Sequence, residues 1–180
     1  MKRLTLLRHA KSDWDDPVAR DFDRPLNRRG EKAARLMGEF AAKRTMHFDL
    51  LVASPAARVV QTLDTFFEGY GETLDARWDR RIYLASSPTL QDVVRDLPDD
   101  ADSVLMAGHN PGLEELILDL VPDDGASPLR EDVEVKFPTA SLAVLELPID
   151  RWTQLADNGA TLASFTRPRD LDPALGPGSR

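Results

Sequence analysis

Short apolar runs alternate with amphipathic segments along the first 120 residues. Three runs, Leu4–Leu7, Leu50–Ala53 and Val104–Ala107, have the length and composition of buried β-strands. The segment after the first run repeats apolar side chains at helical spacings of three and four: Ala33, Leu36, Met37 and Phe40. This order of strands and helices predicts a single three-layer α/β domain, with a mostly parallel central sheet and helices on both faces.

Helix-starting signals follow the second and third apolar runs. Ser54 and Pro55 suit the start of a helix, because serine can cap the free N–H groups and proline is tolerated at the first helical position. Asn110 and Pro111 repeat this combination after the third run, and a further helix is predicted over residues 88–97. Helices are therefore expected to begin directly after two of the strands.

The remaining segments complete the predicted organisation. Apolar and polar residues alternate over Ala140–Leu147 and Ala160–Phe165, which predicts two antiparallel strands at an edge of the sheet. The segment Asp13–Pro25 is rich in Asp, Arg and Pro and predicts a loop that can close over the end of the first strand. We place one domain at residues 1–167 and expect the Pro- and Gly-rich residues 168–180 to form a loose tail.

Composition and charge exclude several classes of function. The chain has 180 residues and no cysteine, which rules out disulfides, thiolate metal sites and cysteine nucleophiles. A net charge of −8 repels nucleic acid and anionic lipid at long range. No apolar run has the length of a membrane-spanning helix. We therefore expect a cytoplasmic protein that binds neither nucleic acid nor membranes.

Polar residues that can bind an anion follow the three predicted strands. Arg8 and His9 end the first strand, Arg58 lies one turn into the helix after the second, and His109 follows the third. Each has an ordinary interpretation as a turn or surface residue, but the carboxyl ends of parallel strands meet at one edge of a sheet. Arginine beside histidine disfavours a metal cation and favours an anion. His47 lacks such neighbours and is expected to be a surface or packing residue.

Sequence motifs at these positions resemble a known family. The chain resembles the histidine phosphatase superfamily, which includes the phosphoglycerate mutases, in three motifs that follow the family's order and spacing. Leu7–Ser12 is similar to the first histidine motif, Ser54–Thr62 to the start of the arginine helix and Gly108–Pro111 to the second histidine motif. Asp23–Gly30 resembles the segment that leads into the first helix of its SixA-type phosphohistidine phosphatases. The likeness extends over about residues 2–167.

The resemblance implies a role for each of these residues. His9 would be the nucleophile and be transiently phosphorylated, while Arg8, Arg58 and His109 would hold the phosphoryl oxygens and Ser12 would contribute to substrate binding. An imidazole attacks only when neutral, and neighbouring guanidinium groups lower its pKa. Two arginines and a histidine can neutralise the phosphoryl oxygens, so we expect a metal-independent phosphatase with no cofactor. Its substrate would be phosphohistidine in a protein.

The general acid of the expected reaction is not evident. Many members of the family use a glutamate in a loop after the helix that carries Arg58, but residues 80–86 contain none. Asp13, Asp79 and Glu115 are the candidates, although a good leaving group such as imidazole reduces the need for an acid. Three alternatives stay open: a phosphatase of a small phosphorylated metabolite, a non-catalytic phosphate-binding regulatory module, and a metal hydrolase that a chelator would inactivate.

Overall fold

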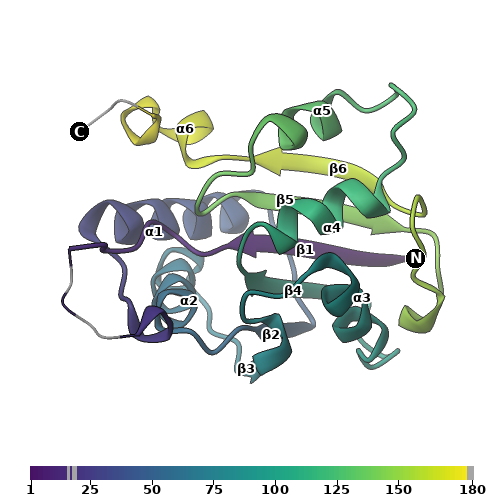
Figure 1. Cartoon of the computed structure of the whole chain (residues 1–180), viewed down its shortest axis with the longest axis horizontal. Helices are drawn as coiled ribbons and strands as arrows, with labels where there is room; N and C mark the ends of the chain where they lie inside the picture. Colours follow the sequence, from purple (N-terminus) through teal and green to yellow (C-terminus); the bar gives the residue numbers. More distant parts are fainter. Residues whose placement is uncertain (16, 18–19, 178–180) are drawn as a thin grey trace.

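One mixed β-sheet carries the fold (Figure 1). The computed structural model describes residues 1–15, 17 and 20–177. The described strands are β1 (Lys2–Arg8), β2 (Leu50–Ala53), β3 (Ala76–Trp78), β4 (Ser103–Gly108), β5 (Leu142–Leu147) and β6 (Thr161–Thr166). The described α-helices are α1 (Arg28–Lys43), α2 (Ala57–Tyr70), α3 (Ser87–Arg95), α4 (Gly112–Leu120), α5 (Pro128–Val135) and α6 (Pro168–Leu171). Short 3₁₀ turns cover η1 (Asp21–Asp23), η2 (Arg80–Ile82), η3 (Trp152–Gln154) and η4 (Pro173–Leu175).

The strand order is β3-β2-β4-β1-β5-β6. The first four strands of this order, β3, β2, β4 and β1, are parallel to one another. The last two are antiparallel to the strand before them: β5 to β1 and β6 to β5. The prediction of a mostly parallel sheet with antiparallel strands at one edge is confirmed. β3 and α5 were not predicted, because β3 has three mostly exposed residues and α5 has a largely charged sequence.

Alternate residues of the central strands face two separate apolar cores. In β4, Leu105 and Ala107 pack with α1 and α2, while Val104 and Met106 pack with α3 and α4. The parallel strands are apolar on both faces because both faces are covered. This arrangement confirms the predicted three layers. Among the described residues, no helix combines the length and the apolar character needed to cross a membrane.

Glycines allow α1 and α2 to pack closely. A Cβ atom at Gly38 of α1 would overlap the backbone carbonyl oxygen of Phe66 in α2, and one at Gly69 would overlap the carbonyl oxygen of Arg35 in α1. Glycine lowers helix propensity, but here it lets the two helix backbones approach each other. The close approach holds α2 against the sheet, and α2 carries Arg58.

We predict that Gly38→Ala lowers the free energy of unfolding by at least about 2 kcal/mol, because the backbone of Phe66 cannot move away as a flexible side chain would. Helix propensity alone predicts the opposite sign, a gain of about 1 kcal/mol. Chemical denaturation measures the difference. The control is Glu39→Ala at the neighbouring exposed position, and a more stable Gly38→Ala variant would contradict the close approach.

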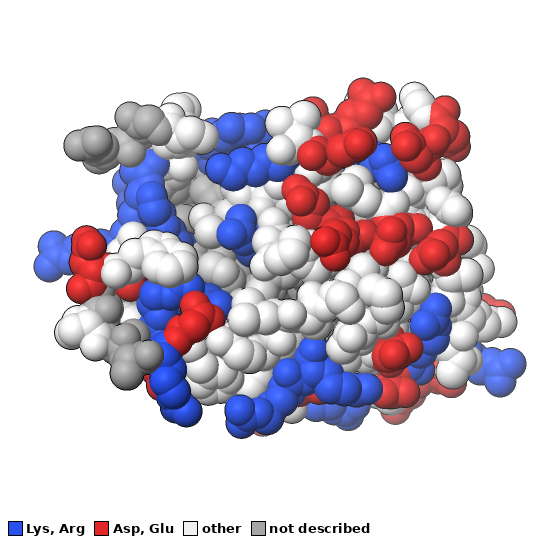
Figure 2. Space-filling view, viewed as in Figure 1, with Lys and Arg blue, Asp and Glu red and all other residues white. Residues whose placement is uncertain are grey.

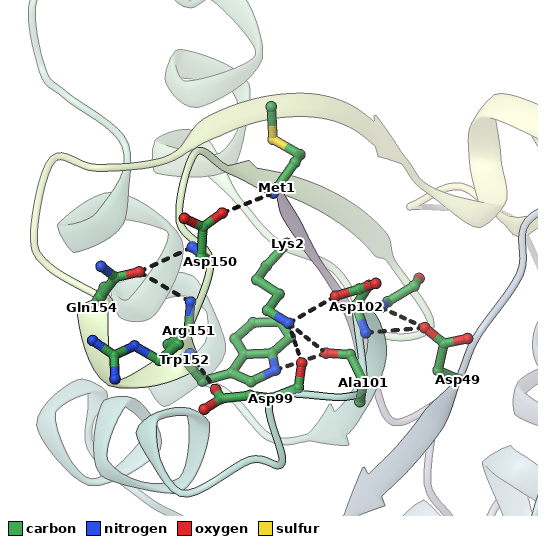
Figure 3. A network of polar contacts seen from close by, with 11 residues as sticks. Met1, Lys2, Asp49, Asp99, Ala101, Asp102, Asp150, Arg151, Trp152 and Gln154 are labelled. Atoms are coloured by element: carbon green, nitrogen blue, oxygen red, sulfur yellow. Dashed lines mark hydrogen bonds and ion pairs between the residues drawn. The ribbon is translucent and has the colours of Figure 1, made fainter.

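A buried lysine joins the amino end of β1 to the loop before β4 (Figure 3). Lys2 is 2% exposed, and its ammonium donates to the backbone oxygens of Asp99 at 2.6 Å and Ala101 at 3.3 Å. It also pairs with the Asp102 carboxylate at 2.7 Å. The Trp152 indole N–H donates to the Ala101 oxygen at 2.8 Å. These partners offset the cost of burying the charge and fix the end of β1 that lies away from Arg8.

The C-terminal segment packs against α1, so the prediction of a loose tail is wrong for residues 168–177. This segment forms α6 and η4. Arg29 of α1 donates to the backbone oxygen of Gly176 at 2.8 Å, and Lys32 pairs with Asp172 at 3.5 Å. Leu175 packs against the core beneath α1. The amino-acid composition of the segment could not predict these contacts, because they depend on residues of α1. The remaining residues of the predicted tail, 178–180, lie outside the described residues.

Candidate active site

The carboxyl ends of three adjacent strands, β2, β4 and β1, meet at one pocket. The pocket has a volume of about 680 Å³. Its lining includes all five residues that the sequence singled out: Arg8, His9, Ser12, Arg58 and His109. His47 lies elsewhere, exposed on the surface and 2.8 Å from Asp49.

Backbone hydrogen bonds hold His9 at the end of β1. Its N–H donates to the Gly108 oxygen at 3.0 Å, and its oxygen accepts the N–H of Ala140 at 3.0 Å. The imidazole Nδ1 lies 2.7 Å from the carbonyl oxygen of Ala10. A carbonyl oxygen can only accept, so Nδ1 carries the proton and the lone pair of the neutral ring resides on Nε2. The fold therefore presets the tautomer that a nucleophilic histidine requires.

Burial and positive charge keep both pocket histidines neutral. Burial, together with the charges of Arg8 and Arg58, lowers the pKa of His9 from 6.5 to about 3. Burial and Arg58 have the same effect on His109, whose pKa is also about 3, although the charge of Asp21 partly opposes the shift. The two rings lie 5.4 Å apart between centroids. Both rings are therefore neutral at neutral pH.

We predict that the free energy of unfolding falls as the pH drops from about 6.5 toward 3. In this window the unfolded chain binds protons at His9 and His109 that the folded chain excludes, so each histidine contributes a slope of about 1.4 kcal/mol per pH unit. Urea denaturation at a series of pH values measures the slope. His9→Gln should reduce the slope by the contribution of one histidine, about 1.4 kcal/mol per pH unit. An unchanged slope in that variant would show that His9 in the folded protein takes up its second proton as readily as in the unfolded chain.

Three arginines surround the histidines. Arg8 donates to the Phe137 oxygen at 3.0 Å. Arg58, which is buried, donates to the backbone oxygen of Asp21 at 2.9 Å and to its carboxylate at 3.0 Å. Arg24 donates to the Ser12 hydroxyl and to the Asp21 carboxylate, both at 2.8 Å. Arg8, Arg24 and Arg58 are thereby held in fixed orientations.

Unpaired donors remain on these same groups. Among the described residues, the buried side-chain polar atoms without a hydrogen-bond partner are Nε of Arg8, Arg24 and Arg58, Nδ1 of His109 and Oγ of Ser141. Four of these five atoms belong to residues that line the pocket. Buried polar groups are normally paired. Several buried nitrogens around one pocket suit an anion with several oxygens, as a phosphoryl group has.

Ser54 positions His109 instead of capping a helix. The sequence predicted a cap, but α2 begins at Ala57 with Ala56 as its N-cap residue. The Ser54 hydroxyl lies 2.8 Å from Nε2 of His109 and accepts the N–H of Ala56 at 3.3 Å. When the hydroxyl donates to Nε2, His109 carries its proton on Nδ1, the atom that has no protein partner. After β4, α4 begins at Gly112, one residue beyond Pro111.

None of the three predicted acid candidates lines the pocket. Asp13 accepts the N–H of Asp15, and Glu115 is exposed on α4. Asp79 caps η2 and pairs with Arg81 at 2.8 Å, and the hydrogen bond from Arg81 lowers the pKa of Asp79. The prediction that the general acid is Asp13, Asp79 or Glu115 is therefore wrong for this pocket. The Asp13 and Asp79 carboxylates accept hydrogen bonds within turns, and Glu115 is exposed to solvent.

Asp21 is the carboxylate that sequence reasoning missed. Burial alone would raise its pKa, but hydrogen bonds from Tyr83, at 2.7 Å, and from Arg58 outweigh that effect and lower the pKa to about 2. Asp21 is thus ionised at neutral pH and orients the arginines rather than donating a proton. The loop over Asp13–Pro25 brings Asp21, Arg24 and Trp14 to the pocket, as far as the chain is described there. The Asp23–Gly30 similarity was the available signal for Arg24.

Comparison with known proteins finds a family model and relatives that match this chain. The family model of the histidine phosphatase superfamily (branch 1) matches residues 4–82. An uncharacterized protein of Mycobacterium tuberculosis, Rv1276c, is 32% identical over 164 residues, which cover 91% of this chain and 100% of that protein. An uncharacterized protein of Mycobacterium leprae, ML1117, is 29% identical over 167 residues, again covering 91% and 100%.

Solved structures extend the likeness to the whole fold. A protein of Nakamurella multipartitia assigned as phosphohistidine phosphatase SixA matches with a TM-score of 0.81 and 29% identity, covering 93% of this chain and 96% of that one. A protein of Agrobacterium tumefaciens with the same assignment matches with a TM-score of 0.73 and 32% identity, covering 92% and 97%. A protein histidine phosphatase SixA complexed with tungstate shares the fold, with a TM-score of 0.76, 20% identity and coverage of 94% and 99%. The chain therefore belongs to the histidine phosphatase superfamily and is of the SixA type.

Proposed function

We propose that the protein is a metal-independent phosphatase that forms a phosphohistidine on His9 and acts on phosphohistidine in a protein. The observation that carries the proposal is the state of His9, a neutral ring whose Nδ1 proton is fixed on the Ala10 oxygen. This leaves Nε2 as the free nucleophile beside Arg8, Arg58 and His109. Membership of the family supports phosphatase activity in general.

In the first proposed step, Nε2 of His9 attacks the phosphorus atom in line with the leaving group. A P–N bond forms on His9 as the P–N bond of the substrate breaks. The electron pair of the broken bond returns to the substrate nitrogen, and the imidazole leaves neutral because its other ring nitrogen carries a proton. Arg8, Arg24 and Arg58 neutralise the charge on the equatorial oxygens, which is the main catalytic requirement of phosphoryl transfer. His109 donates a hydrogen bond from Nδ1.

In the second step, water attacks the phosphorus atom of phosphorylated His9 and the P–N bond breaks, so that its electron pair returns to Nε2. Both protons of the water leave with the inorganic phosphate. The reaction places little demand on a general acid. Imidazole is a good leaving group, whereas an alkoxide must be protonated as it leaves. Among the described residues, Asp21 is the carboxylate that lines the pocket, and it is ionised. This supports a substrate with a leaving group of the imidazole type.

The test is a comparison of rates for a histidine-phosphorylated protein, free phosphohistidine, an aryl phosphate and an alkyl phosphate, combined with trapping of the enzyme intermediate. We expect the phosphohistidine substrates to be hydrolysed fastest, with and without a chelator. Labelled enzyme should lose its phosphate in acid and retain it in alkali. Faster hydrolysis of the alkyl phosphate would contradict the proposed substrate, and loss of activity with the chelator would support a metal hydrolase.

The same experiment separates the two other candidate functions. A small-metabolite phosphatase would form the acid-labile label but prefer a sugar phosphate over the phosphorylated protein. A non-catalytic phosphate-binding module would form no label and release no phosphate, while still binding tungstate as a phosphate mimic.

A further inference from the structure

Five cations besides Arg8, Arg24 and Arg58 line the same pocket. One of them, Arg167, pairs with Asp170 at 2.8 Å, and the other four carry the argument. We call these four the basic rim: Lys11, Arg29, Lys136 and Arg169. Lys11 and Lys136 are exposed, and Arg29 and Arg169 are half-buried. None of the four forms an ion pair with any other residue that the structure describes, although Arg29 donates to the Gly176 backbone. Figure 2 shows blue side chains gathered beside a hollow on this face.

A phosphoryl group alone does not require the rim. Three guanidinium groups, Arg8, Arg24 and Arg58, and the carboxylate of Asp21 already give the inner pocket a net charge of +2. A phosphorylated side chain carries a charge of about −1.5 to −2 at neutral pH, so the inner pocket is sufficient to balance it. The rim adds four further positive charges in a chain whose net charge is −8. These charges are available to additional anionic groups on the same substrate.

Two features near the basic rim favour a protein surface as the source of those anionic groups. Trp14 lines the pocket, is 77% exposed and lies over the Arg24 guanidinium at 3.4 Å. An exposed aromatic ring beside cations suits a partner surface that is both apolar and acidic. Beside the hollow, carboxylates gather over α4 and α5 (Figure 2). They would repel an extended polyanion that crosses this face, whereas a local acidic cluster can contact the rim alone.

We propose that the basic rim docks an acidic protein surface around the phosphohistidine, so that carboxylates flanking the phosphorylated residue select the substrate. This inference rests on the proposed function and deepens it, because it assigns the recognition of the substrate to residues that take no part in the chemistry. Complementary charges at the rim of an interface mainly raise the association rate and fix the orientation.

The experiment compares two short peptides with a central phosphohistidine, one flanked by glutamates and the other by glutamines. Binding is measured by fluorescence anisotropy on the His9→Ala variant, so that the result does not depend on turnover. We expect the glutamate peptide to bind at least about tenfold more tightly at low salt, and the advantage to shrink at high salt. Lys136→Glu combined with Arg169→Glu should remove most of the advantage.

The matched control is Lys43→Glu combined with Arg77→Glu, which makes the same change in net charge at exposed positions outside the pocket. The control should retain the preference for glutamate. Equal binding of both peptides, or the same loss in the control, would overturn the proposal. Tighter binding of a small sugar bisphosphate that the rim variant abolishes would also overturn it. Wild-type hydrolysis of the peptides is followed in parallel, so a failure of the proposed function would show as binding without turnover.

Discussion

Replacing His9 by alanine is expected to lower kcat for hydrolysis of free phosphohistidine by at least about 10⁴-fold. The variant loses the Nε2 atom that would accept the phosphoryl group, and the covalent route through two easier steps is then closed. Arg8 and Arg58 remain and can still bind the substrate, so KM should change far less than kcat. Steady-state kinetics with a phosphate-release assay measures both parameters.

The control for this prediction is His47→Gln, since His47 is exposed and lies outside the pocket. It should keep the wild-type rate. Circular dichroism would verify that the His9→Ala variant is folded. Residual activity above about one per cent of the wild-type value, or a label that persists in the His9→Ala variant, would place the nucleophile on another residue.

Removal of the Arg58 guanidinium is expected to lower kcat/KM by about 10²- to 10³-fold. Arg58 is buried and has an unpaired Nε, so its charge acts at short range with little screening by water. In Arg58→Ala the ionised Asp21 also loses a partner, and its charge would then repel the phosphoryl group. Arg58→Lys should recover only part of the activity, because an ammonium lacks the planar fork that contacts both the backbone oxygen and the carboxylate of Asp21.

The surface arginine Arg35 supplies the control, because it pairs with Glu68 at 2.8 Å outside the pocket. Arg35→Ala should leave kcat/KM unchanged. Thermal unfolding of Arg58→Ala separates a catalytic loss from a structural one. A rate within about threefold of the wild type in folded Arg58→Ala would contradict a role for this guanidinium in holding the phosphoryl oxygens.

Much of the fold was predictable because its strands have a simple signal. The central parts of β1, β2 and β4 are buried on both faces, so each strand contains a short, mostly apolar run, and polar residues follow that run. The helices after β2 and β4 were also predictable, although they begin two residues after Pro55 and one residue after Pro111. Short or charged elements such as β3 and α5 lack such a signal and form because neighbouring segments pair with them or pack on them.

The candidate site divides in the same way. Arg8, His9 and His109 were predictable, because their positions at strand ends follow from the apolar pattern and the order of the parallel strands. Arg58 was predictable because it lies at the start of the helix that follows β2. Asp21 and Tyr83 were not predicted, since their contact joins residues 62 positions apart through a hydrogen bond. Ser54 was assigned to a helix cap because the sequence cannot show that His109 competes for its hydroxyl.

The sequence by itself determined the three-layer fold, the strand ends that carry the pocket residues and the resemblance to the family, because these depend on local periodicity and on residue types at short spacings. Only the tertiary structure decided the tautomer of His9, the low pKa values of both histidines, the ionised state of Asp21 and the packing of residues 168–177 against α1. Burial, hydrogen bonding and charge at a given atom depend on which distant segments surround it, and that is set when the chain folds.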